Sequence, residues 1–197
     1  MIPQMIHFET IIQEYYPEDN KLRQLLWCHS RDVADRALDI VRRHPELGAD
    51  AHFVEQAAML HDLGIFLTDA PGIHCHGKEP YIRHGLLGAG LLRRDASKWI
   101  AGNPQQVAEA IEPYARVCER HTGAGISLSN IERQQLPLPH HDFLPETIEE
   151  QIICYADKFF SKSHPERVKT LEQATKSLSK FGEDGVGRFL AWAGMFE

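Results

Sequence analysis

Apolar residues recur along most of the chain with the 3.6-residue period of an amphipathic α-helix. Asp50 stands where a side chain caps the first turn of a helix. Pro104 suits a first helical turn, because the N–H that proline lacks has no partner there. The pattern predicts helices over about 20–43, after Asp50, over 81–94, after Pro104, over 145–161 and, more weakly, within 165–194.

Two long loops interrupt this helical pattern. One runs from Asp69 to Pro80 and the other from Gly123 to Leu144, and both contain glycine, proline and paired histidines. Loops of this length inside a domain are uncommon and often carry function. No stretch alternates between apolar and polar residues as a strand does, so we expect an all-α fold.

The composition sets limits on the function. The chain has 197 residues, 43% of them hydrophobic, which suits a single globular domain over residues 1–197. Its net charge of −7 argues against a nucleic acid polymer as partner, and it has no apolar run long enough to span a membrane. The first nine residues lack a signal peptide's pattern, and the four cysteines form no Cys-x-x-Cys pair. We therefore expect a cytoplasmic protein with reduced thiols.

Several polar side chains fall on the apolar helix faces. They are His29, His61, His84, His121 and Asp157, and Asp62 lies next to one of them. A single inward histidine is usually satisfied by a neighbouring carbonyl group. An ionised aspartate inside a helical bundle, however, costs several kcal/mol unless a cation pairs with it. Metal ions neutralise carboxylates and accept the lone pairs of imidazoles, so the set as a whole predicts a metal site.

The order of these residues resembles the HD-domain superfamily, which is named for an adjacent His-Asp pair. The resemblance runs from His29 to about Ser161 and rests on the segments Cys-His-Ser-Arg-Asp-Val-Ala, Ala-Met-Leu-His-Asp-Leu-Gly, Arg-His-Gly-Leu-Leu-Gly-Ala and Ile-Cys-Tyr-Ala-Asp-Lys. The segment Glu-Arg-His-Thr-Gly-Ala-Gly-Ile-Ser is similar to a branch related to hydrolases that split dinucleoside tetraphosphates. This implies an HD-type helical bundle with core motifs in residues 29–161 and a C-terminal helical extension over 165–197.

The resemblance also implies the roles of the ligands. The positions of His29, His61, Asp62 and Asp157 bind a first metal in this superfamily. The positions of His84 and His121 bind a second metal in some members, with the position of Asp62 bridging both. Imidazole and carboxylate ligands without thiolate favour iron, manganese or another first-row ion. Two such divalent ions per chain hold a bridging hydroxide that attacks a phosphoryl group, which makes Asp62 catalytic as well.

One position departs from the pattern of most HD hydrolases. They place a lysine or arginine shortly after the His-Asp pair to contact phosphate, whereas this chain has Ile65 there. We expect a replacement among the cations near the other motifs. In the first loop, His76 is a candidate proton donor to a leaving group. The candidate substrate-binding cations are Lys78, Arg83, Arg120 and Lys158.

Three functions fit these features. The first is a metal-dependent phosphohydrolase that acts on a phosphorylated small molecule, such as a nucleotide or dinucleotide. The second is a mixed-valent di-iron oxygenase that cleaves a C–C or C–P bond, because some HD members use the same four histidines and two aspartates for it. The third is a metal-bound sensor without turnover, which the complete ligand set disfavours. The sequence leaves the oligomeric state open.

Overall fold

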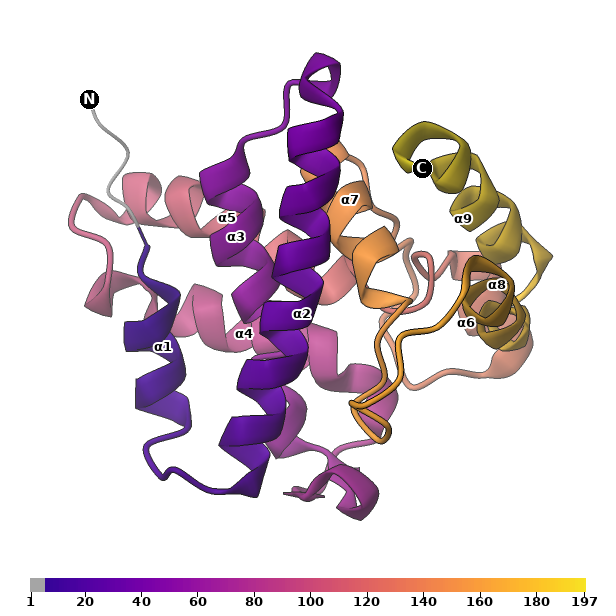
Figure 1. Ribbon diagram of the computed structural model, residues 1–197. Helices are drawn as coiled ribbons and strands as arrows, with labels where there is room; N and C mark the ends of the chain where they lie inside the picture. Colours follow the sequence, from indigo (N-terminus) through magenta and orange to yellow (C-terminus); the bar gives the residue numbers. More distant parts are fainter. Residues whose placement is uncertain (1–5) are drawn as a thin grey trace.

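The computed structural model describes residues 6–197, and helices form nearly all of its regular structure (Figure 1). The α-helices are α1 (Phe8–Tyr15), α2 (Lys21–Arg43), α3 (Ala51–Leu60), α4 (His84–Asp95), α5 (Pro104–Arg120), α6 (Leu128–Gln134), α7 (Ile148–Asp157), α8 (Leu171–Leu178) and α9 (Glu183–Phe196). Short 3-10 turns cover Pro45–Leu47, Ile65–Leu67, Pro71–Ile73, Tyr81–Arg83, Ala96–Lys98 and Ser179–Phe181. The strands β1 (Asp69–Ala70) and β2 (Cys75–His76) pair antiparallel. The expected all-α fold is therefore confirmed.

The helices with the clearest periodic pattern begin where the sequence predicts. The side chain of Asn20 accepts a hydrogen bond from the N–H of Arg23 and caps α2. Asp50 caps α3 by accepting from the N–H groups of His52 and Phe53, and Pro104 opens α5. Each cap satisfies N–H groups that have no partner within the helix, so the chain enters the helix at a defined residue.

Other boundaries differ from the prediction. The last core helix begins at Ile148 instead of Pro145, because the side chain of Thr147 accepts from the N–H of Glu150 and caps it there. The loop expected from Gly123 to Leu144 contains α6, which Ser127 caps in the same way. The segment 81–94 opens with a 3-10 turn, and α4 begins only at His84. Helix α1, whose Ile11 and Ile12 are buried, was not predicted.

Helices α2, α3, α4, α5 and α7 pack against one another and form the centre of the bundle (Figure 1). Helix α9 packs on the outer side of α7, where the ring of Tyr155 meets those of Phe189 and Phe196 at centroid distances of 4.9 and 5.4 Å. All three side chains belong to one apolar core cluster that also includes α1. The C-terminal segment thus shares a core with the region that carries the motifs.

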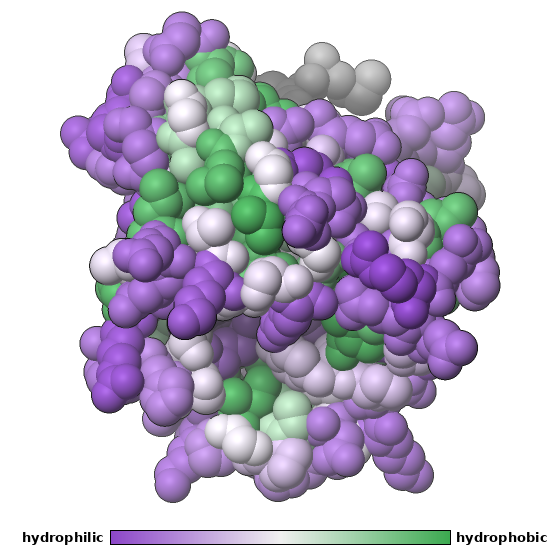
Figure 2. Space-filling model, turned by 90° about the vertical axis from the view of Figure 1, so that its right-hand side faces the viewer, coloured by the Kyte–Doolittle hydropathy of each residue, from purple (hydrophilic) through white to green (hydrophobic). Residues whose placement is uncertain are grey.

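Figure 2 looks onto the side of α8 and α9, where hydrophobic atoms lie among hydrophilic ones. The large apolar side chains exposed in the described part of the chain are Val168, Leu171, Leu190 and Met195. No helix within residues 6–197 is long and apolar enough to cross a membrane. All four cysteines are free thiols. The expectation about an export signal concerns residues 1–9, of which 1–5 lie outside the described residues.

Glycines let α4 approach its neighbours closely. A Cβ added to Gly85 would lie 2.3 Å from the carbonyl oxygen of Cys118 on α5. A Cβ on Gly64 would lie 2.3 Å from the carbonyl oxygen of His84 and 2.4 Å from the amide nitrogen of Gly88. These contacts involve backbone atoms, which a side-chain rotation cannot relieve. The small residues therefore bring the segments that carry His84, His121 and the His-Asp pair together.

We expect Gly85→Ala to lower the free energy of unfolding by about 1–3 kcal/mol, because the backbones of α4 and α5 must separate to admit a methyl group. The matched control is Gly90→Ala on the same helix, where an added Cβ meets nothing within 4 Å. The free energy of unfolding of Gly90→Ala should rise by about 0.4–1 kcal/mol, since alanine loses less backbone entropy on folding than glycine does. Urea denaturation of both variants tests this, and equal stability would contradict the close approach.

Candidate metal centre

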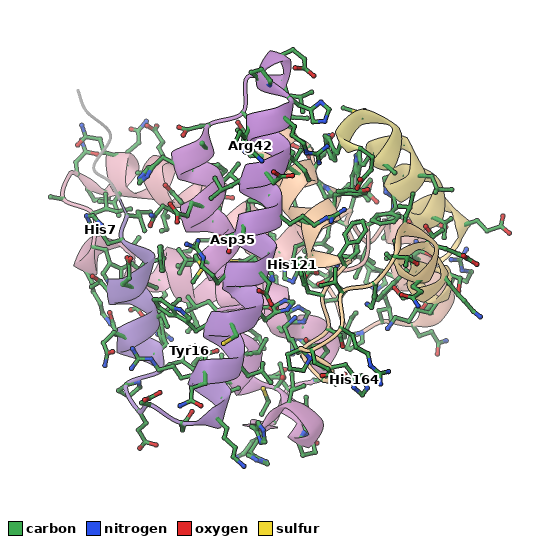
Figure 3. The ribbon with its side chains drawn as sticks, in the orientation of Figure 1. His7, Tyr16, Asp35, Arg42, His121 and His164 are labelled. Atoms are coloured by element: carbon green, nitrogen blue, oxygen red, sulfur yellow. The ribbon has the colours of Figure 1, made fainter. Side chains whose placement is uncertain are left out.

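Six side chains from five segments converge in the middle of the bundle. His29 lies within α2, His61 and Asp62 follow α3, His84 opens α4, His121 follows α5, and Asp157 ends α7. All six are buried, with between 0 and 8% of their surface exposed. In Figure 3 His121 lies in the interior behind α2, whereas His7 and His164 lie at the periphery. The structure thus brings together all six residues that the sequence proposes as ligands.

The carboxylate of Asp62 stands between two groups of histidines. Its Oδ2 atom lies 3.2 Å from Nε2 of His29 and 3.1 Å from Nε2 of His61. Its Oδ1 atom lies 3.3 Å from Nε2 of His84 and 3.4 Å from Nε2 of His121. Each oxygen of this carboxylate therefore serves a different pair of imidazoles.

Asp157 adds a second carboxylate on the side of His29 and His61. Its Oδ1 atom lies 3.0 Å from Nε2 of His29 and 3.5 Å from Nε2 of His61. Donor atoms within 4.8 Å of one another occur in three sets: His29, His61 and Asp62; His61, His121 and Asp157; and Asp62, His84 and His121. Both carboxylates thus lie beside His29 and His61, whereas Asp62 is the carboxylate beside His84.

Backbone carbonyls fix the orientation of three imidazole rings. Nδ1 of His61 lies 2.5 Å from the carbonyl oxygen of Ala58. His84 and His121 make the same contact at 2.7 Å with the carbonyl three residues earlier. A carbonyl oxygen only accepts, so Nδ1 must donate, and in the neutral ring Nε2 keeps its lone pair. All three rings thus direct Nε2 toward the carboxylates. In addition, the ring of Tyr81 stacks on that of His84 with centroids 4.6 Å apart.

Burial and the neighbouring charges separate the pKa values of these groups. Burial lowers the pKa of His84 to about 3, with help from His121 and Lys162. Burial also lowers the pKa of His121. Burial disfavours the charged form of His61 too, but the charges of Asp62 and Asp157 outweigh it and raise the pKa to about 9. His84 and His121 are therefore neutral near pH 7, the state in which an imidazole binds a metal.

The aspartates stay ionised in spite of their burial. Burial raises the pKa of Asp62, but His61 and Lys162 outweigh it and hold the pKa well below its usual range. Burial likewise raises the pKa of Asp157, and Lys158, His29 and His61 outweigh it. The centre therefore holds two carboxylate charges close together.

The donor set fits divalent first-row ions. The buried atoms Nε2 of His29, Nε2 of His61 and Oδ1 of Asp62 have no hydrogen-bonding partner. The Nε2 atoms of His84 and His121 lie 3.0 Å apart, which is roughly the spacing of two adjacent ligands at metal–nitrogen distances of about 2.1 Å. Imidazole with carboxylate suits iron, manganese and similar ions. The cluster is thus compatible with metal binding.

Lys162 is a member of the centre that the sequence analysis did not propose. Its Nζ atom lies 2.5 Å from Oδ2 of Asp62, and 12% of its side chain is exposed. Burial lowers the pKa of this amine, but the charges of Asp62 and Asp157 outweigh it and raise the pKa. Lys162 lies five residues beyond Asp157 in an irregular segment. Helical periodicity does not predict where a side chain of an irregular segment points. The sequence therefore gave no signal that Lys162 contacts the centre.

The proposed substrate-binding cations lie in different surroundings. Arg83 pairs with Glu79 at 2.5 Å, and Arg120 pairs with Glu146 at 2.9 Å and Glu150 at 3.4 Å. Lys78 is exposed. Lys158 is the one of the four that contacts the centre: its Nζ lies 2.6 Å from Oδ2 of Asp157 and donates to the carbonyl of His121 at 3.0 Å. Nearby carboxylates thus hold the two arginines in ion pairs.

The structure does not bring the remaining histidines into the centre. His76 belongs to β2, is exposed, and does not line either of the cavities beside the centre. Its role as proton donor remains a prediction. His74 is exposed. The other six histidines outside the centre are exposed or partly exposed, as expected: His7, His44, His52, His140, His141 and His164.

A cavity of about 180 Å³ opens directly beside the centre. Three of the six converging residues, His84, His121 and Asp157, contribute to its wall. Tyr81, Thr122 and Gly123 also line it. The rest of the wall is rich in lysine and comes from the segments after Asp157 and around α8: Lys158, Phe160, Lys162, Lys169, Ser177, Leu178, Lys180 and Phe181. A small anionic molecule in this cavity would lie next to His84 and His121.

An all-helical bundle that buries four histidines and two aspartates around a cationic cavity defines a metal-binding helical protein. Comparison with known families gives the particular class: residues 26–161 match the sequence model of the HD domain, and the chain belongs to this family. The resemblance drawn from the motifs is thereby confirmed at the level of the family.

Three known proteins are similar to this chain, at 29–33% sequence identity. Two are named tRNA (cytidine(56)-2′-O)-methyltransferase: that of Picrophilus torridus is 29% identical over 172 residues, and that of Thermoplasma volcanium is 32% identical over 161 residues. Each match covers 81% of this chain but only 40% and 38% of the relative. An uncharacterised protein of Methanocaldococcus jannaschii is 33% identical over 132 residues, which is 66% of this chain and 63% of that protein. No solved structure matched the chain significantly.

Proposed function

We propose that this chain is a metal-dependent phosphohydrolase that cleaves a phosphate ester or anhydride in a small nucleotide-like molecule. The observation that carries the proposal is the carboxylate of Asp62, whose two oxygens face separate pairs of histidines at 3.1–3.4 Å. That arrangement suits two neighbouring ions that share one ligand. When bound, such ions supply Lewis acidity and lower the pKa of water at the site.

The protein groups around the centre have distinct roles in this proposal. His29, His61 and Asp157 would hold a first ion, His84 and His121 would hold a second, and Asp62 would contribute to both. Lys158 and Lys162 border the cavity and neutralise the oxygens of a phosphoryl group. Lysine thereby takes the place of the cation that most HD hydrolases carry after the His-Asp pair.

The relatives named as methyltransferases do not change this proposal. A match over 81% of the chain has to include most of residues 26–161, so the shared region covers most of the HD domain. This region accounts for less than half of those relatives' length, and methyl transfer is therefore not carried over. The narrower resemblance to the hydrolases that split dinucleoside tetraphosphates favours a nucleotide or dinucleotide substrate.

A mixed-valent di-iron oxygenase is the alternative, because it uses the same ligand types. The lysines beside the centre suit an anionic substrate of either enzyme. The hydrolase is favoured because the segment Glu-Arg-His-Thr-Gly-Ala-Gly is similar to the hydrolytic branch. A sensor without turnover is the remaining alternative, and a measured rate of phosphate release would exclude it.

We expect metal-free protein to regain phosphate release from nucleotides when either manganese or iron is added, and to do so under nitrogen. Phosphoryl transfer needs only Lewis acidity and an activated water, which manganese provides. An oxygenase requires iron that changes its oxidation state. The assay measures phosphate release and oxygen consumption with each ion. Oxygen uptake on an organic substrate with iron alone, and no phosphate release, would overturn the hydrolase proposal.

A further inference from the structure

Two of the lysines that line the cavity have no carboxylate partner. Lys158 and Lys162 pair with Asp157 and Asp62, as described above. Neither Lys169 nor Lys180 forms an ion pair within 4 Å in the described part of the chain. Nζ of Lys169 donates to the carbonyl oxygen of Lys158 at 3.3 Å, and Nζ of Lys180 lies 5.0 Å from the centre of the Phe181 ring. The cavity wall therefore carries an excess of positive charge.

This excess is unusual in a chain with a net charge of −7. Burial lowers the pKa of Lys169, and the charges of Lys158, Lys180 and Lys162 lower it further, while Asp157 acts in the opposite direction. The lysines thus lie close enough to destabilise one another, and ions in the metal centre would add more positive charge. An anion in the cavity relieves this repulsion.

The segment that carries these lysines is fixed against the centre. The backbone N–H of Lys169 donates to the carbonyl of Phe159 at 2.8 Å. Gly123, two residues after His121, has a φ of 63°, and a Cβ there would lie 3.2 Å from the Phe181 ring. Arg188 of α9 donates to the carbonyls of Ala124 and Gly125 at 2.8 and 3.1 Å. Lys180 is thereby held beside the loop that follows a candidate ligand.

A second cavity of about 410 Å³ adjoins the first. The two share Tyr81, Phe160, Lys162 and Lys180 in their walls. The wall of the second cavity also includes Ala70 and Ile73, so an apolar surface lies beyond the lysines. An extended molecule with charge at one end and an organic group at the other fits this arrangement.

We propose that Lys169 and Lys180 bind a second phosphate group of the substrate, next to the phosphate that the metal centre cleaves. The substrate class is thus a molecule with two or more adjacent phosphate groups, whose organic part lies toward Ile73 and Phe160. This inference rests on the proposed hydrolase function. Both lysines lie outside residues 26–161, so the part of the chain that does not match the HD model supplies the specificity.

The test compares two probes that cannot be hydrolysed, methylphosphonate with one phosphonate group and methylenediphosphonate with two, on manganese-loaded protein. Lys169→Gln and Lys180→Gln should each weaken binding of methylenediphosphonate about tenfold, and binding of methylphosphonate less than about threefold. The matched control is Lys176→Gln, an exposed residue of α8 that lines neither cavity and should bind both probes as the unaltered protein does. Calorimetry measures the affinities, and metal analysis afterwards shows that manganese was retained.

Equal losses for the two probes, or no loss for either, would overturn the second-phosphate site. Arginine at both positions should restore most of the affinity, because it keeps the charge. Lys180 is exposed, so its replacement does not endanger the fold. Phosphate release by the unaltered protein is measured separately. If that release is absent while the diphosphonate preference is present, the hydrolase function fails and the anion site stands.

Discussion

Asp62→Ala is expected to remove both metal ions and to reduce phosphate release by at least about a thousandfold. This carboxylate faces both pairs of histidines, so its loss removes a ligand from each ion and a charge that balances them. His84→Ala removes a ligand from the second ion only. It should keep about one ion per chain, against about two for the unaltered protein. Metal analysis of the three proteins measures this directly.

Loss of Asp62 also leaves the ammonium group of Lys162 without its carboxylate partner, and a buried unpaired charge destabilises the fold. Lys162→Met is made in the unaltered protein and in Asp62→Ala, which separates the effect of the unpaired charge from the loss of a metal ligand. The double variant should fold and still contain no metal. Equal metal content in Asp62→Ala and His84→Ala would show that Asp62 does not bridge two ions.

Phe189→Ala is expected to lower the free energy of unfolding by about 3–5 kcal/mol, because it empties a buried site between α9 and α7. The adjacent Leu190 is 48% exposed and provides the control. Leu190→Ala should cost less than about 1 kcal/mol. Guanidinium denaturation followed by circular dichroism measures both variants.

The same measurement tests whether the C-terminal segment belongs to the domain. A single transition in both variants would support one cooperative unit over the motifs and the C-terminal helices. A small loss for Phe189→Ala, or a separate early transition, would show that α9 unfolds independently of the region that carries the metal centre.

The sequence could predict those parts of the molecule that follow from helical periodicity. His29 and Asp157 were placed by their spacing from buried residues of the same helix, and the structure brings them within 3.0 Å of each other. The helix starts at Asp50, a side-chain cap, and at Pro104, the first residue of α5, were recognisable because few residue types suit a first turn. The helical period relates neighbours in the chain, and it was sufficient wherever a ligand lies on or next to a long helix.

Of the lysines that line the cavity, Lys158 was proposed from the sequence, but the others could not be predicted in this way. Lys162 and Lys169 lie in irregular segments, where the direction of a side chain depends on backbone angles that no period describes. Arg83 and Arg120 were proposed because each precedes a ligand. A helix turns by about 100° per residue, so adjacent side chains point in different directions. In the structure these arginines pair with the carboxylates of Glu79 and Glu146, and their role in substrate binding stays a prediction.

The contacts that orient His61, His84 and His121 have a consequence for how this centre tolerates change. Each ring donates to a carbonyl three residues earlier, at Ala58, Tyr81 and Cys118. In many metal sites a carboxylate side chain does this, and a single substitution then releases the ligand. Every amino acid has a carbonyl oxygen, so side-chain replacement at these three positions leaves the acceptor in place. The imidazole tautomer that metal binding requires is thus set by the course of the backbone and not by the side chains at these three positions.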